Sequence, residues 1–215
     1  MRIAALFTVC LVTSLSQGAL AAAASPAASL EVGASLGYSI PIANAERDAR
    51  VRDTTFGAVP VSLDVAYRVR PQVGVVAQVQ YGVGIPTLCK TAGDCRASFG
   101  TDVLVLLGVS LYAPHVGPMS PEGGLGIGYE WFTARLSDSG AHSSRGYEGP
   151  VVLWASVAAP FRLADRWTLG PVAQGAWGTF TGSSLRTNVG SVSANVAERS
   201  MHAWIQLAVR VAHEF

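Results

Sequence analysis

One segment of the chain gathers side chains that could do chemistry together. Residues 141–148 read AHSSRGYE and include His142, Ser143, Ser144 and Glu148. A histidine can take the proton of a neighbouring serine, and a carboxylate can orient that histidine, which is the arrangement for nucleophilic acyl transfer. Serine and histidine are also common in polar loops, and this segment lies between two apolar stretches. We therefore interpret it as a solvated loop and expect no catalytic site, cofactor or metal site.

Two cysteines are candidates for a disulfide. Cys89 and Cys95 are separated by five residues, and the third cysteine, Cys10, lies in the N-terminal segment. An even pair in an exported chain indicates a disulfide. Two free thiols or half a metal site are the alternatives, but no histidine lies within about twenty residues of the pair. We therefore expect a disulfide between Cys89 and Cys95.

The N-terminal segment has the three parts of a secretory signal peptide. The chain begins with Met-Arg, continues with an apolar stretch over residues 3–15, and reaches an A-x-A cleavage site around Ala21. The apolar stretch is too short for a spanning helix. We expect residues 1–24 to be removed after export through the Sec pathway, and residues 25–215 to form one domain.

The composition narrows the class of protein. Charged residues make up 13% of the 215 residues, and the formal net charge is +1, whereas an average soluble domain has about 25% charged residues. Near-neutral charge argues against a nucleic-acid-binding protein, which needs clustered Lys and Arg to pair with phosphates. Beyond the N-terminal segment, no apolar run approaches the roughly 18–20 residues of a membrane-spanning helix. The sequence therefore predicts an all-β domain.

Alternation of apolar and polar residues dominates the chain after residue 30 and indicates strands with one apolar face. It recurs in eight segments, residues 30–40, 58–70, 73–83, 103–111, 124–131, 151–163, 167–180 and 202–215. The long connections, residues 41–57, 86–98, 133–147 and 181–199, all fall at the same end of these strands. An even number of antiparallel strands with long loops at one end is the architecture of an outer-membrane barrel.

The charged residues of these segments share one face. No Asp, Glu, Lys or Arg falls on the apolar faces, where a basic residue would cost about 2–4 kcal/mol at the midplane of a membrane. We expect charges on the opposite faces to form a paired network in the lumen: Glu31, Asp64, Arg68, Asp102, Glu130, Arg162 and Arg210. A row of glycines, Gly124, Gly126 and Gly128, is expected to leave room for the inward ring of Trp154.

Aromatic residues on the apolar faces are sorted by height. Beside the short turns we expect one girdle, formed by Tyr67, Phe161, Trp167 and Phe215. Toward the long loops we expect a second girdle, formed by Tyr38, Tyr81, Phe99, Trp131, Tyr147 and Trp177. The ten residues from Trp167 to Trp177 span about 34 Å of strand, and a tilt near 40° projects this to about 26 Å. That height matches the apolar band of an outer-membrane barrel, which is about 25 Å.

The C-terminal segment IQLAVRVAHEF carries the most specific resemblance. The mature sequence resembles the small eight-stranded outer-membrane proteins of the OmpA transmembrane-domain and OmpX type. The resemblance implies an antiparallel up-and-down transmembrane β-barrel in a Gram-negative outer membrane, in contact with lipid and lipopolysaccharide. It also implies that the barrel-assembly machinery reads the segment ending in Phe215, although His213 replaces the more usual aromatic residue.

Three prolines are unfavourable in a closed barrel, because proline has no N–H to donate to the hydrogen-bond ladder between strands. They are Pro60, Pro160 and Pro171. We expect Pro171 in particular to lie at an irregularity.

Three classes of function fit this architecture: a structural, adhesive or surface-interaction protein, a narrow pore, and a lipid A-modifying enzyme. We favour the first, with no nucleic-acid partner and an extracellular partner that the sequence does not identify. Eight strands normally leave no open channel. The Ser and His spacing of residues 141–148 does not resemble the motif of the eight-stranded lipid A deacylases, so we expect no enzyme.

Overall fold

The computed structural model describes residues 29–42, 44–46, 49–50, 55–86, 97–114, 116–138, 141–196 and 201–215. The expected signal peptide (residues 1–24), Cys89 and Cys95 lie outside these residues. No helix in the described part of the chain is long and apolar enough to cross a membrane.

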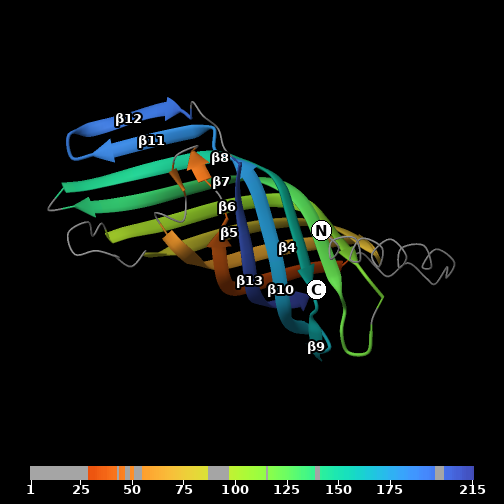
Figure 1. Ribbon diagram of the computed structural model, residues 1–215. Coiled ribbons are helices and arrows are strands. Elements are labelled where there is room, and N and C mark those ends of the chain that lie inside the picture. The colour runs from red at the N-terminus through yellow and green to blue at the C-terminus, as the bar shows by residue number, and fades with distance from the viewer. Residues whose placement is uncertain are drawn as a thin grey trace, which may run out of the picture.

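Eight antiparallel strands close into a barrel (Figure 1). They are β1 (Ser29–Pro41), β4 (Thr55–Arg70), β5 (Val73–Pro86), β6 (Ala97–Tyr112), β7 (Glu122–Asp138), β8 (Ala141–Ala158), β10 (Trp167–Thr179) and β13 (Met201–Glu214). Each pairs with the next along this order, and β13 pairs with β1 to close the ring. The predicted all-β, up-and-down barrel of eight strands is confirmed.

Five short strands lie outside this ring. β2 (Asn44–Glu46) and β3 (Ala49–Arg50) pair with each other, and β9 (Phe161–Ala164) pairs with the start of β10. β11 (Gly182–Thr187) and β12 (Gly190–Asn195) form a hairpin that extends the sheet beside β8. Figure 1 shows this hairpin, together with β7 and β8, reaching beyond the closed part of the barrel. We use the name protruding sheet for β11, β12 and the ends of β7 and β8 that extend beyond the closed ring.

The protruding sheet replaces two of the long loops that the sequence predicted. Residues 133–147 continue β7 and begin β8, and residues 181–199 contain the β11–β12 hairpin. Both stretches lack the apolar alternation of the barrel strands, because both faces of a sheet outside a core or a lipid phase can be polar. Pairing of backbone N–H and C=O groups, which is independent of side-chain type, holds these strands together.

The eight strands show an apolar belt on the outside. Each contributes at least one large apolar side chain that is more than a third exposed: Leu36, Leu63, Val79, Leu107, Ile127, Val157, Leu169 and Leu207. Inside, apolar side chains such as Ala66, Leu106, Val151, Trp154 and Ala176 form a buried cluster. The alternation therefore has the inside-to-outside sense that the sequence predicted, with apolar residues exposed on the wall.

The glycine row of β7 gives room to Trp154, as expected. Gly126 pairs with Trp154, and a methyl group added at Gly124 would lie 2.8 Å from Cζ3 of that ring. One step further along β8 the ladder has a bulge, where Val152 and Leu153 are both exposed. The extra residue reverses the faces of the preceding part of β8, so Val151 points inward with 1% of its surface exposed. Strict alternation over residues 151–163 predicts Val151 on the outer face with Leu153, and this prediction was wrong.

Two of these three prolines, Pro171 and Pro60, lie beside gaps in the hydrogen-bond ladder between strands. Pro171 pairs with Val209 on one side, while on the other side the neighbouring strand breaks between β8 and β9. At that break the N–H of Ala159 donates to the carbonyl of Pro171 at 3.1 Å. Pro60 lies where the β1–β4 register is interrupted, between the pairs Leu36 with Val61 and Ser39 with Ala58. Each missing N–H therefore falls where a ladder is already open.

Candidate functional site

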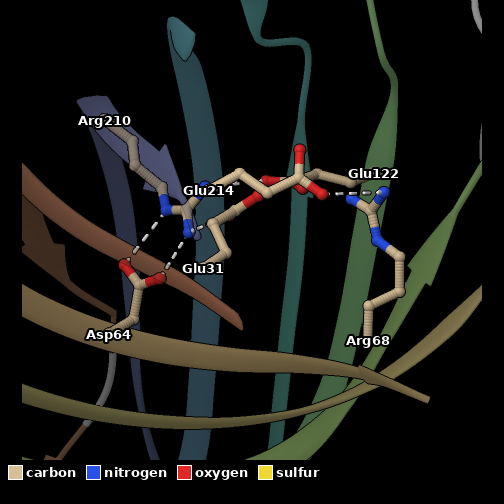
Figure 2. Close-up of polar contacts among 6 residues, drawn as sticks. All are labelled: Glu31, Asp64, Arg68, Glu122, Arg210 and Glu214. Atoms are coloured by element: carbon tan, nitrogen blue, oxygen red, sulfur yellow. Dashed lines mark hydrogen bonds and ion pairs between the residues drawn. The ribbon is translucent and has the colours of Figure 1, made fainter. Parts of the chain in front are cut away.

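The lumen is crossed near the short-turn end by an arginine that binds three carboxylates (Figure 2). Arg210 of β13 donates from Nη2 to Glu31 at 2.7 Å, from Nη1 to Glu122 at 3.3 Å and from Nε to Asp64 at 3.0 Å. Its partners belong to β1, β7 and β4, so the guanidinium links strands from different sides of the ring. Because the Arg210 side chain is 13% exposed, these bonds are shielded from water and are expected to be strong.

A second basic residue extends this layer. Arg68 lies 3.9 Å from a carboxylate oxygen of Glu214, and its guanidinium stacks 4.0 Å from the ring centre of Tyr112. Figure 2 shows Arg68 and Arg210 with the four carboxylates arranged between and around them. Charged side chains that form ion pairs with one another therefore fill this end of the lumen.

Amide side chains fill the middle of the lumen. Gln174 of β10 donates to Gln80 at 3.2 Å and accepts from Gln78 at 3.5 Å, and Ser62 donates to Gln80 at 3.2 Å. Between this layer and Arg210 lies a cavity of about 50 Å³. About 10–15 Å³ of such space holds one water molecule, so this cavity has room for a few water molecules.

A carboxylate with two buried donors lies above the amide layer. Glu130 accepts from Nε1 of Trp204 at 2.7 Å, and its other oxygen lies 2.6 Å from Nε2 of His202. Phe180 stacks on the His202 ring at 3.8 Å between centres, with an angle of 2° between the planes. Phe132, Tyr147 and Val196 complete a buried apolar cluster around Phe180 and Trp204. This cluster closes the lumen toward the protruding sheet.

Six of the seven charges expected in the lumen lie on its wall. Glu31, Asp64, Arg68 and Arg210 form the layer described above, Glu130 is 0% exposed, and Asp102 is 5% exposed. Arg162 is the exception: it lies on β9, all four residues of which are exposed. The expectation for Arg162 was wrong because the sixth predicted strand breaks at Ala159 and Pro160, and β9 lies outside the closed ring.

Most of the aromatic residues predicted for the two girdles also lie where the sequence placed them, on the outside of the barrel. Tyr67, Tyr81, Trp131, Phe161, Trp167 and Phe215 are exposed on the outside, and Tyr38 and Trp177 are half-buried there. The ladder places Tyr81 and Trp131 in one row, on either side of Val103. Tyr147 was expected in the outer girdle but points into the lumen with 5% of its surface exposed, because the bulge in β8 reverses its face. The side chain of Phe99 lies outside the described part of the structure.

Sequence reasoning missed three residues of the lumen network. Glu122 lies just before the predicted segment 124–131, and it continues the even-numbered inward frame of Gly124, Gly126 and Gly128, which is the signal that could have found it. His202 and Trp204 were placed on the polar face of the last segment, but no local pattern shows that they meet Glu130.

The catalytic-looking segment is part of a strand. Ser143, Ser144 and Glu148 lie on β8, and the side chain of His142 lies outside the described residues. Across the described residues, no group of three or more His, Cys, Asp or Glu side chains is arranged to hold a metal ion.

No family model matches the sequence, and no curated protein matches it. Solved structures do resemble the fold. A major outer membrane protein from Thermus thermophilus is 15% identical with a TM-score of 0.62, covering 88% of this chain and 100% of that one. Neisserial surface protein A is 9% identical with a TM-score of 0.48, and the match covers 90% of this chain and 100% of that one. The Yersinia pestis attachment invasion locus protein Ail, solved in complex with a heparin analogue, is 12% identical with a TM-score of 0.49, and the match covers 87% of this chain and 99% of that one. The fold is that of the small eight-stranded outer-membrane β-barrels.

Proposed function

We propose that this protein is a Gram-negative outer-membrane barrel that acts through the surface it raises above the membrane, in a structural or surface-interaction role, and not through a channel. The observation that carries the proposal is the filled lumen. Ion pairs around Arg210, amides around Gln174 and the aromatic cluster around Phe180 follow one another along its length. A cavity of about 50 Å³ lies between the first two layers.

The outer wall supports a location in lipid. Exposed apolar side chains surround all eight strands, whereas a soluble monomer rarely exposes a contiguous apolar patch larger than a few hundred Å². In a lipid phase this belt is buried, and the closed ring of described strands gives each of the eight strands a paired neighbour on both sides. The protruding sheet then stands outside the membrane, at the opposite end from the C-terminus (Figure 1).

Three measurements test the proposal and its alternatives. In the outer-membrane fraction, the folded protein is expected to migrate differently on a detergent gel before and after boiling, and a soluble protein without this shift would contradict the location. In a planar bilayer, the purified protein is expected to give no discrete conductance steps. Stable steps in the wild type would instead favour the narrow pore. Mass spectrometry of lipid A from cells with and without the protein tests the enzyme alternative, for which we expect no change.

A further inference from the structure

The outward face of the protruding sheet carries a hollow of about 710 Å³. Residues directly opposite each other in antiparallel strands point to the same side. Thr133, Gly146, Ser184 and Ser193 are in register across β7, β8, β11 and β12, and therefore form one row on this face. The same face includes Trp131, which lies one row nearer the barrel.

Small side chains make the floor of this hollow. Gly146 has no side chain, and a methyl group added there would lie 2.6 Å from Oγ of Ser184. At Gly182 an added methyl group would lie 2.9 Å from Cγ of Glu148. The Glu148 side chain therefore packs over Gly182. Hydroxyl groups of Thr133, Ser184 and Ser193, together with the Asn195 amide, line the space around these glycines. Neutral groups that both donate and accept hydrogen bonds are suited to a hydroxyl-rich ligand.

Arg186 lines the far side of the hollow, and Arg135 lies in the same cross-strand row of this face. Arg135 of β7 and Arg186 of β11 both pair with Ser144 of β8, so they flank this small residue on the outward face. Both side chains are exposed, and among the described residues neither forms an ion pair. Guanidinium groups bind phosphate oxygens through paired N–H donors. The two arginines therefore form an anion-binding edge.

The height of the hollow above the Trp131 girdle matches the depth of lipid headgroups. Each row along a strand is two residues, or about 5 Å of height at a tilt near 40°. The Thr133 row is thus about 5 Å and the Arg135 row about 10 Å above the Trp131 girdle. Lipid headgroups occupy about 5–8 Å on each side of the hydrocarbon core. Below Trp131 the same face continues into exposed apolar residues, including Ile127 and Val152.

We propose that the hollow holds the phosphorylated sugar headgroup of an outer-leaflet lipid. Its phosphate lies between Arg135 and Arg186, its sugar hydroxyls bond to Ser184, Ser193 and Asn195, and Glu148 accepts from a sugar hydroxyl or amide. The acyl chains run down the apolar wall below Trp131. A free phosphate ester lacks these chains and would make only part of the contact. This inference rests on the proposed outer-membrane location.

Native mass spectrometry of the purified full-length protein tests this site. The probes are a bisphosphorylated glucosamine-disaccharide lipid, its dephosphorylated form, phosphatidylglycerol and inorganic phosphate. The double variant Arg135→Gln/Arg186→Gln is expected to bind the phosphorylated glycolipid about 10- to 100-fold more weakly, because charge-assisted hydrogen bonds are lost. Ser184→Phe, which fills the hollow and keeps both arginines, is expected to weaken binding about tenfold or more.

Matched controls separate the site from the general lipid shell. Arg166→Gln removes an exposed arginine in the turn after β9, and Val192→Phe adds a ring on the opposite face of the protruding sheet. Both are expected to bind the glycolipid like the wild type. Unchanged binding in the double arginine variant and in Ser184→Phe would overturn the proposal, leaving only non-specific lipid contact.

For each of the other probes, one result would overturn a part of the proposal. Equal retention of phosphatidylglycerol would overturn the sugar part of the proposal, and equal retention of the dephosphorylated lipid would overturn the phosphate part. Displacement of the lipid by millimolar inorganic phosphate would identify free phosphate as the ligand. If the wild-type protein fractionates with the outer membrane but does not bind the glycolipid, only the proposal for the hollow is refuted. If the wild-type protein is absent from that fraction, the proposed function is refuted.

Discussion

Glu130 and His202 are 72 residues apart in the sequence and meet inside the barrel, with 2.6 Å between Oε2 and Nε2. Both side chains are fully buried, at 0% and 1% exposed. The other oxygen of Glu130 accepts from Trp204, so one carboxylate joins β7 to two residues of β13. These strands are not neighbours in the ring, and the contact therefore crosses the lumen.

Glu130→Ala should destabilise the barrel strongly. It leaves the N–H of Trp204 and the facing nitrogen of His202 buried without an acceptor, which costs about 3–5 kcal/mol when one partner of a buried pair is removed. Glu130→Gln keeps an acceptor for Trp204 and should lose less. Urea unfolding in lipid vesicles measures the difference, with the exposed Glu148→Ala as control. Equal stability of the two alanine variants would show that the cross-lumen contact contributes little.

Arg210→Met should also lower the free energy of unfolding by about 3–5 kcal/mol, because it leaves three carboxylates in a confined space without their cation. Neutralising those carboxylates in the same chain, as Glu31→Gln, Asp64→Asn and Glu122→Gln, should recover most of the loss. The recovery is the informative readout in the same urea titration. A quadruple variant no more stable than Arg210→Met alone would mean that the unpaired charges are not the cause.

Two valines give a matched test of where the membrane lies. Val209 on the barrel wall is 56% exposed and Val192 on the protruding sheet is 68% exposed. In water, arginine at either position would be tolerated. In the membrane, Val209→Arg should cost about 2–4 kcal/mol while Val192→Arg costs close to nothing. Unfolding titrations and the yield of heat-modifiable protein in cells measure this, and equal behaviour would argue against a lipid-facing wall.

Gly124→Val tests the packing of Trp154. The added side chain begins 2.8 Å from the ring, so the core must shift, which costs about 1–3 kcal/mol. A second substitution, Trp154→Leu, should restore part of the stability by giving back the space. Gly123→Val is the control, because a methyl group there meets only one carbonyl oxygen at 3.4 Å. If thermal unfolding showed the same loss for both valine variants, strand propensity rather than the ring would be responsible.

The sequence alone determined the class of fold and the direction of most side chains. Val209 faces outward and Arg210 inward because successive residues of a strand point to opposite sides, so a local period of two carries this information. The absence of charge from the apolar faces, together with short turns at one end, was enough to predict a closed barrel of eight strands. These signals are local, and each can be read without knowing which strands pair.

Only the tertiary structure decided the features that depend on register and closure. The bulge at Val152 and Leu153 turned Tyr147 inward, and the break at Pro160 removed Arg162 from the lumen. A single extra or missing residue reverses every face beyond it, and the local pattern tolerates either choice. Contacts such as Glu130 with His202 exist because the ring closes and brings distant strands face to face. The hollow beside Arg186 likewise arises from the register of four strands, which no one segment encodes.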